Sequence, residues 1–160
     1  MRRKSLSTLI GALLLYSLLT PIVVARADDS GWVKRDPSCS CQGITSSSDG
    51  SKLAGFVNGG KIVTSSDYGA TWVAHESNRN WSGIAASSDG TKLVATVEGG
   101  QIYTSTDSGV TWTARDSVRP WFGVASSSDG AKLVAIVNPG QIYTSTDSGA
   151  TWTVHESTRA

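Results

Sequence analysis

Residues 105–112 read STDSGVTW, and this stretch decides how the rest of the chain is interpreted. Close copies stand at 65–72 (SSDYGATW) and at 145–152 (STDSGATW). The tryptophans Trp72, Trp112 and Trp152 therefore follow one another at exact intervals of 40 residues. A fixed period of this size indicates a tandem array of one supersecondary unit. It predicts the architecture, and it says little about chemistry.

Each repeat reads as four short strands separated by turns. In the second copy the predicted strands are 83–86, 92–97, 101–105 and 111–115, and most are rich in β-branched and aromatic residues. The first turn contains Asp-Gly, a strong hairpin signal, and no segment after residue 27 has helical periodicity. Four-stranded antiparallel units of about 40 residues predict an all-β fold of propeller blades, whereas the coils of a parallel β-helix are usually shorter.

The repeats predict an incomplete ring. Three full blades are expected at 41–80, 81–120 and 121–160. A lone strand and linker over 28–40 precede them, because Trp32 lies 40 residues before Trp72 and Asp36 lies 40 residues before Glu76. Closed propellers typically have four to eight blades, so three blades and one strand would leave exposed edges. Two explanations stay open: several chains close one ring as a homo-oligomer, or the chain is a shortened part of a larger propeller. A three-bladed monomer is the least expected.

The pattern S-x-D-x-G-x-T-W resembles the Asp box, also called the bacterial neuraminidase repeat. This motif is found in sialidases, other glycosidases, sortilin-type receptors and photosystem assembly factors. All three copies match it at every defined position, and with their blades they cover residues 41–156. The resemblance implies propeller blades and leaves the activity open, because these proteins share the fold and not the chemistry. In sialidase-like propellers, these turns lie on the face away from the active site.

The motif residues are expected to hold the fold together. An Asp side chain can accept hydrogen bonds from backbone amides of its own turn, and the Gly can take a positive φ. The Trp can bury a large ring beside the turn. We therefore predict a structural role, and no ligand contact, for Ser65, Asp67, Gly69, Thr71, Trp72, Ser105, Asp107, Gly109, Thr111, Trp112, Ser145, Asp147, Gly149, Thr151 and Trp152.

A candidate ligand rim is expected on the opposite face. The connection between blades repeats an acid-Ser-x-Arg-x-Trp pattern, at 76–81 and 116–121, and the loops between second and third strands contribute Asn58, Glu98 and Asn138. Arginine, carboxylate and indole groups suit sugars or acidic ligands. The alternative is structural: each acid pairs with the Arg three residues on, and each Trp packs between blades. The candidate rim consists of Arg79, Trp81, Glu98, Arg119 and Trp121.

Catalysis is not expected. Sialidases that resemble this fold use an arginine triad, a tyrosine–glutamate pair, an aspartate acid and an Arg-Ile-Pro motif, and the chain has no Arg-Ile-Pro. His75 and His155 occupy one repeat position where the middle copy has Arg115, which argues against a shared catalytic role. The leading hypothesis is a binding or scaffold module for a glycan or protein. Alternatives are a sialidase-like hydrolase fragment, a photosystem-type assembly factor, and a relic without selected function.

The N-terminal residues look like an export signal. Arg2, Arg3 and Lys4 precede an apolar stretch over 6–24, and Ala-Arg-Ala at 25–27 fits a signal-peptidase site. A retained membrane anchor is the alternative. Cleavage after Ala27 would leave a secreted or periplasmic domain without membrane attachment. The net charge of +1 is scattered, so nucleic acid is not an expected partner.

The chain has only two cysteines, Cys39 and Cys41. On a strand, residues two apart share a face but lie too far apart for an unstrained bridge. Two thiolates alone also leave a tetrahedral zinc site incomplete. Free or intermolecular cysteines are therefore the expectation, and neither a metal nor a cofactor is predicted.

Overall fold

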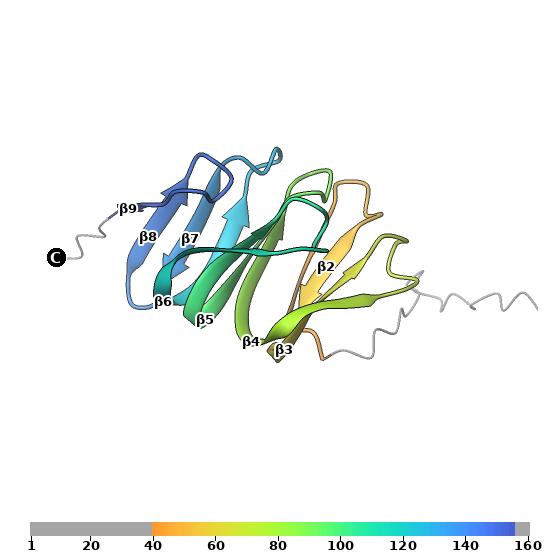
Figure 1. Cartoon of the computed structure of the whole chain (residues 1–160). Coiled ribbons are helices and arrows are strands. Elements are labelled where there is room, and N and C mark those ends of the chain that lie inside the picture. The colour runs from red at the N-terminus through yellow and green to blue at the C-terminus, as the bar shows by residue number, and fades with distance from the viewer. Residues whose placement is uncertain (1–39, 156–160) are drawn as a thin grey trace, which may run out of the picture. The chain divides into compact units, whose positions relative to one another are not determined.

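The structure, a computed structural model, describes residues 40–155. These residues form nine strands and no helix, and each strand pairs antiparallel with its sequence neighbours (Figure 1). The strands are β1 (Gly43–Ser46), β2 (Leu53–Phe56), β3 (Asn58–Ser65), β4 (Val73–Ala86), β5 (Leu93–Ser105), β6 (Thr113–Ser126), β7 (Leu133–Val137), β8 (Gln141–Ser145) and β9 (Thr153–His155).

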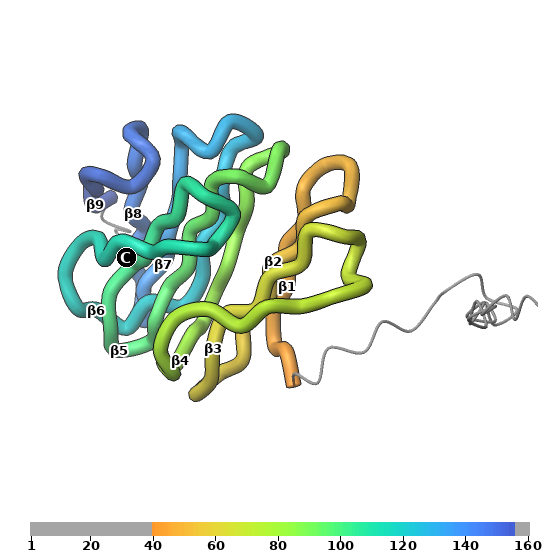
Figure 2. Tube along the Cα trace, turned by 45° about the vertical axis from the view of Figure 1, so that its right-hand side comes forward, coloured from red at the N-terminus to blue at the C-terminus, as the bar shows by residue number. Residues whose placement is uncertain are grey.

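The pairing divides these strands into three four-stranded blades. The first part of β4 pairs with β3, and its second part, from Trp81 onward, pairs with β5. β6 is shared in the same way between the second and third blades. Figure 2 shows the three groups of strands side by side. The predicted all-β architecture of propeller blades is confirmed, and the ring is not closed, because β1 and β9 are the ends of the strand order.

The segments expected to be loops on the rim side are largely extended strand. β5 contains both the second and the third strand of its blade, and β4 and β6 run from one blade into the next. Register shifts accompany these connections, between Glu98 and Gly100 and again between Gly100 and Ile102. Glu76 and Asp116 adopt positive φ values of 64° and 52°. Bulges of this kind bend a strand sharply while its pairing continues on both sides.

The hydrophobic core lies between blades. One cluster joins Phe56 and Ile62 of the first blade to Trp81 and Tyr103 of the second. The other cluster repeats this arrangement one blade further, around Trp121. Each blade alone is too thin to bury such side chains, so neighbouring blades stabilise one another.

Several predictions fall near or beyond the ends of the described residues. The predicted signal peptide at 1–27 and the residues Trp32, Asp36 and Cys39 lie outside them. Cys41 is disulfide-bonded, so the expectation of a free thiol at this position is wrong. Within residues 40–155, no helix has the length and hydropathy needed to cross a membrane.

Candidate functional site

The eight-residue turn closes on itself through hydrogen bonds. In the second blade the Thr111 amide and hydroxyl donate to the Asp107 carboxylate, at 2.9 and 2.6 Å. The Ser105 hydroxyl also donates to Asp107 at 2.8 Å, and it accepts from the Gly109 amide at 2.9 Å. The Trp112 indole N–H donates to the Gly109 carbonyl at 2.9 Å. The same bonds recur in the other two turns, so each turn is closed by hydrogen bonds among its own residues.

These hydrogen bonds also stabilise the charged form of each aspartate. The hydroxyl and amide of Thr111 lower the pKa of Asp107 to about 2, and Thr151 does the same for Asp147. The Thr71 amide, followed by its hydroxyl, lowers the pKa of Asp67 to about 2. Carboxylates held this firmly in the ionised state are poor proton donors at neutral pH.

A second turn that closes on its own side chains lies beside the first, and the sequence indicated it only by the Asp-Gly dipeptide. The Ser87 hydroxyl donates to Asp89 at 2.6 Å and accepts from the Lys92 amide at 3.0 Å. The Ser108 amide then donates to the Thr91 carbonyl at 2.9 Å, which ties the two turns together. A serine stands two residues before each Asp-Gly, at 47, 87 and 127, and this repeated serine could have predicted the hydrogen bonds of the turn. This end of the blades is therefore engaged in its own hydrogen bonds.

The candidate rim lies at the opposite end of the strands. Glu98 faces Pro120 across the β5–β6 pair, and Gly100 faces Arg119. The first blade repeats this register, with Gly60 opposite Arg79. The structure thus brings together the two connections that the sequence placed on one face, now as neighbouring strands.

Both rim arginines lie over tyrosine rings. The guanidinium carbon of Arg79 is 4.6 Å from the ring centre of Tyr103, and that of Arg119 is 4.8 Å from Tyr143. Both side chains are about one-third exposed, at 33 % and 37 %. Each pairs loosely with the acid three residues earlier, at 3.5 Å for Arg79 and 3.9 Å for Arg119. The arginines are held in position and still face solvent in part.

The two rim tryptophans do not reach the surface. Trp81 and Trp121 are completely buried, and the Trp81 indole donates to the Gly60 carbonyl at 3.1 Å. They pack between blades, as the structural alternative described, and a ligand at the surface would not touch them. Of the five candidates, Arg79, Glu98 and Arg119 remain accessible.

Three polar atoms at the rim are buried without a hydrogen-bond partner among the described residues: Arg79 Nε, Arg119 Nε and Asp116 Oδ2. Buried polar groups normally find hydrogen-bond partners, because leaving them unpaired costs free energy. These atoms sit on the same arginine–acid pairs that face solvent. The rim therefore has hydrogen-bonding capacity that contacts within the described chain do not use.

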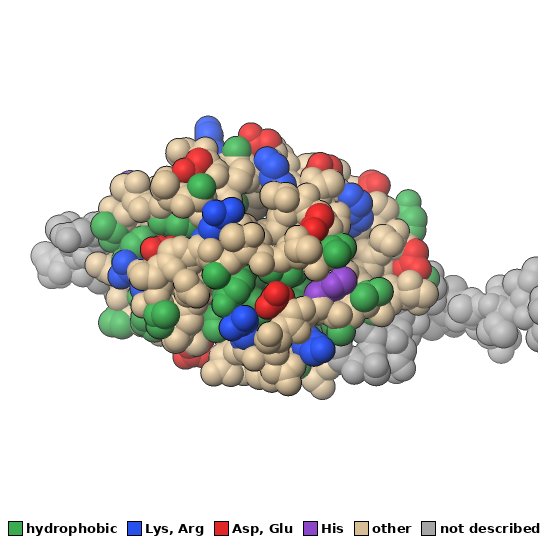
Figure 3. Space-filling model, in the orientation of Figure 1, with side chains coloured by type: hydrophobic (Ala, Val, Ile, Leu, Met, Phe, Trp, Pro, Cys, Tyr) green, Lys and Arg blue, Asp and Glu red, His purple; other side chains and the backbone are tan. Residues whose placement is uncertain are grey.

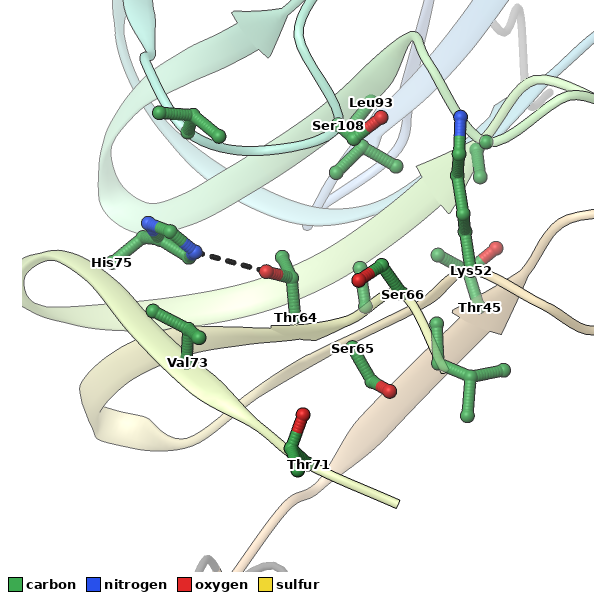
Figure 4. Close-up of a pocket in the computed structure, with 15 residues that line it drawn as sticks. Thr45, Lys52, Thr64, Ser65, Ser66, Thr71, Val73, His75, Leu93 and Ser108 are labelled. Atoms are coloured by element: carbon green, nitrogen blue, oxygen red, sulfur yellow. Dashed lines mark hydrogen bonds between the residues drawn. The ribbon is translucent and has the colours of Figure 1, made fainter. Parts of the chain in front are cut away.

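Grooves between blades form a further candidate. The groove between the first and second blades has a volume of about 240 Å³, and its wall includes Lys52, Thr64 and His75 (Figure 4). His75 Nε2 and the Thr64 hydroxyl lie 2.9 Å apart. In the second groove, Arg115 Nε donates to the hydroxyl of Thr104 at 3.1 Å. The threonine at this repeat position is therefore bonded by a histidine in the first blade and by an arginine in the second, which indicates a structural contact.

Metal ligation has no support in the described part of the chain. Among residues 40–155, no group of His, Cys, Asp and Glu side chains is arranged to hold a metal ion.

No protein-family model and no curated protein matches the chain. Solved structures do: YCF48 with a bound D1 peptide has 18 % identity and a TM-score of 0.59, over 69 % of this chain and 39 % of its own length. A GH74 enzyme of Niastella koreensis has 26 % identity and a TM-score of 0.60, over 78 % of this chain and 19 % of its own. The β-propeller domain of Cps50 (Swd1) of Myceliophteria thermophila has 15 % identity and a TM-score of 0.60, over 77 % and 40 %.

The chain spans at most two-fifths of the length of these structures. The likenesses support β-propeller architecture, and they include both an enzyme and a protein with a bound peptide. Fold alone does not assign an activity.

Proposed function

We propose that this chain is an exported binding or scaffold module built on propeller blades, and that it acts without catalysis. The observation that carries the proposal is the repeated arginine arrangement at the rim. Arg79 and Arg119 occupy equivalent positions, each lies over a tyrosine ring, and each is partly exposed. Cation–π contact with the ring positions the guanidinium and leaves N–H groups for a ligand.

The ligand that suits this rim is an acidic peptide or an acidic glycan. A guanidinium donates two parallel hydrogen bonds to a carboxylate, which gives both affinity and orientation. Glu98 is exposed and lies across the β5–β6 pair from Pro120, next to Arg119. It adds an acceptor for a sugar hydroxyl or a peptide amide. The rim therefore combines donors and acceptors within one short stretch of sheet.

A photosystem-type assembly factor is a second candidate. The likeness to YCF48 with a bound D1 peptide favours this candidate, because it is a likeness to a protein that binds a peptide. The near-identity of the repeats speaks against it. Residues 101–109 and 141–149 have the same sequence, and a surface adapted to one large partner usually differs between blades.

A glycoside hydrolase fragment is the enzymatic alternative, and the likeness to a GH74 enzyme keeps it in view. What supports a non-catalytic role is the state of the turn aspartates. Asp67, Asp107 and Asp147 are each committed to their own turn, with the pKa lowered to about 2. Hydrolysis of a panel of chromogenic glycosides and sialosides by the purified chain would contradict the proposal.

The binding test compares two variants on glycan and peptide arrays. Arg79→Ala combined with Arg119→Ala should abolish retention of acidic ligands. Lys132→Ala should leave it intact, because Lys132 is an exposed cation beside the turns at the far end of the blades. Unchanged binding by the correctly folded double variant would rule out the rim as the site.

Export is part of the proposal and has its own test. The basic residues at 2–4, the apolar stretch at 6–24 and the Ala-x-Ala site at 25–27 support it. Protein recovered outside the cytoplasm should begin at Asp28 by N-terminal mass spectrometry. A chain retained in the cytoplasm with Arg2 still present would contradict secretion or a periplasmic location.

A further inference from the structure

The third blade exposes a face that is covered in the other blades. Three apolar side chains on β7 and β8 are much more exposed than their counterparts 40 residues earlier. They are Val134 (37 %, against 2 % for Val94), Ile136 (40 %, against 0 % for Thr96) and Ile142 (43 %, against 0 % for Ile102). Figure 3 shows hydrophobic side chains on the left-hand side of the molecule, where the third blade lies in Figure 1. In the first two blades the following blade covers these positions.

The first blade exposes the other half of the same joint. Ile44 on β1 is 64 % exposed, whereas Ile84 and Val124 at the same repeat position pack against the core clusters. In the second and third blades, this position faces the preceding blade. The described blades thus end in two different apolar faces, of the kinds that meet one another at the internal joints.

Backbone hydrogen bonds show the same pattern. The Ser48 amide donates to the Ser88 carbonyl at 2.7 Å, and the Ser88 amide donates to the Ser128 carbonyl at 2.7 Å. Among the described residues, the Ser128 amide has no acceptor and the Ser48 carbonyl has no donor. One end of the blade series is therefore an open donor, and the other end is the matching open acceptor.

The turns fit one another closely at each internal joint. A Cβ at Gly90 would lie 2.9 Å from Cβ of Lys52, and a Cβ at Gly130 would lie 2.9 Å from Cβ of Lys92. The corresponding Gly50 of the first blade has open space around it. Lys132, exposed on the third blade, is the residue that would fill this space in a further joint.

From these observations we infer that the third blade of one copy binds the first blade of a second copy, head to tail. The joint reuses the serine hydrogen bond of the internal joints, and it covers the exposed apolar side chains of β7 and β8. Such a heterologous contact closes a ring when the rotation per subunit allows it, and two copies make six blades, within the usual range of closed propellers. The inference deepens the proposed scaffold role, and it does not depend on the arginine rim.

The joint between copies differs from the internal joints at three core positions, 41, 55 and 63. Gly55 stands where the other blades have Ala95 and Ala135, and Val63 stands where they have Tyr103 and Tyr143. Cys41 stands where the second and third blades have Trp81 and Trp121, both completely buried. A second copy would therefore leave Ile142 in contact with a smaller side chain. We expect reversible association whose extent rises with protein concentration.

Cross-linking between two variants of the full chain, each with one cysteine added to Cys39 and Cys41, tests the direction of the contact. Ser128→Cys and Ser48→Cys are conservative changes at exposed residues that lie outside the strands. A short bismaleimide should link the two variants into a dimer when they are mixed, and should link neither variant to itself. A chain that carries both changes should give a discrete doubly linked dimer.

The internal joint provides a matched positive control. Ser48→Cys with Ser88→Cys in one chain places the thiols at the same relative positions, and this pair should react within the chain. Absence of intermolecular product while this control reacts would overturn the inference. Equal dimer yield from either variant alone would also overturn it, because the contact would then be symmetric, and a ladder of larger products would overturn closure by two copies.

A second pair of variants separates the apolar face from general charge effects. Ile136→Glu should lower the yield of cross-linked dimer at least tenfold, because it places a carboxylate in the joint. Val154→Glu should leave it unchanged, because position 154 and its counterparts Ala74 and Ala114 are exposed in every blade. Equal cross-linking by both folded variants would overturn the assignment of the face. The array binding of the variant with Arg79→Ala and Arg119→Ala tests the rim separately from the joint.

Discussion

The indole of Trp121 meets the ring of Tyr143 edge to face, with the ring centres 5.0 Å apart and the planes at 73°. Trp81 and Tyr103 repeat the contact one blade earlier, at 5.4 Å and 71°. The Tyr143 ring also lies under the guanidinium of Arg119. One tyrosine in each of these blades therefore links the buried core to the solvent-facing rim, so the core packing positions the candidate binding groups.

Removal of a core indole should destabilise the protein strongly. Trp121→Ala should lower the free energy of unfolding by about 3–5 kcal/mol, because the side chain is completely buried. The neighbouring Phe122→Ala should change it by only about 0.5 kcal/mol, because Phe122 is 60 % exposed. Urea denaturation at low protein concentration measures both. Equal losses for the two variants would contradict the described burial.

The turn aspartate should matter more than its neighbour. Asp107→Ala removes the acceptor of the Thr111 amide, the Thr111 hydroxyl and the Ser105 hydroxyl, so the thermal midpoint should fall by several degrees. Thr106→Ala alters an exposed residue of the same turn and should leave the midpoint nearly unchanged. Differential scanning calorimetry compares the two variants. A midpoint of Asp107→Ala equal to that of the wild type would show that the turn does not need the carboxylate.

Stability should fall on acidification. The pKa of Asp67, Asp107 and Asp147 is about 2 in the folded chain, against a usual value of 3.8, because hydrogen bonds from the turn stabilise the carboxylate. Between about pH 4 and pH 2 the unfolded chain binds more protons than the folded chain, so protonation favours unfolding. The contribution of these groups is fully present above roughly pH 5.

The urea midpoint, measured from pH 7 to pH 2, should therefore stay level and then drop below about pH 4. Asp147→Asn should show a shallower drop, because one of the depressed carboxyl groups is gone. A midpoint that is constant down to pH 2 would contradict the hydrogen bonds of the turns.

Two glycines with positive φ should respond differently to alanine. Gly99 has a φ of 66° and open space around it, so Gly99→Ala should cost about 1 kcal/mol of backbone strain. Gly109 has a φ of 89°, and a Cβ there would lie 2.8 Å from Thr64 and 3.0 Å from Leu93. Gly109→Ala should therefore cost about 1–3 kcal/mol more. Equal unfolding free energies would show that the first and second blades do not approach each other at this turn.

Features that depend on residues close in the chain were predictable. The spacing of Trp72, Trp112 and Trp152 indicated the blades, and the Ser-x-Asp-x-Gly pattern indicated turns that close on their own side chains. In the structure, Asp107 bonds residues no more than four positions away. Interactions of this range are specified by the local sequence, and repetition makes the pattern visible three times over.

Features that depend on two blades at once needed the folded arrangement. The second and third repeats each contain two tryptophans, and their neighbours in sequence did not predict that Trp112 is half-buried while Trp121 is completely buried. Trp121 is enclosed because Val94 and Ile102 of one blade meet Leu133 and Tyr143 of the next. The same long-range packing removed both tryptophans from the candidate rim and left its arginines.

The two ends of the blade series show the division most clearly. Ile102 and Ile142 have the same neighbours in sequence, since residues 101–109 and 141–149 are identical. One is completely buried and the other is 43 % exposed. The difference comes from the presence or absence of a following blade, because burial depends on which surfaces meet in space and not on the local sequence.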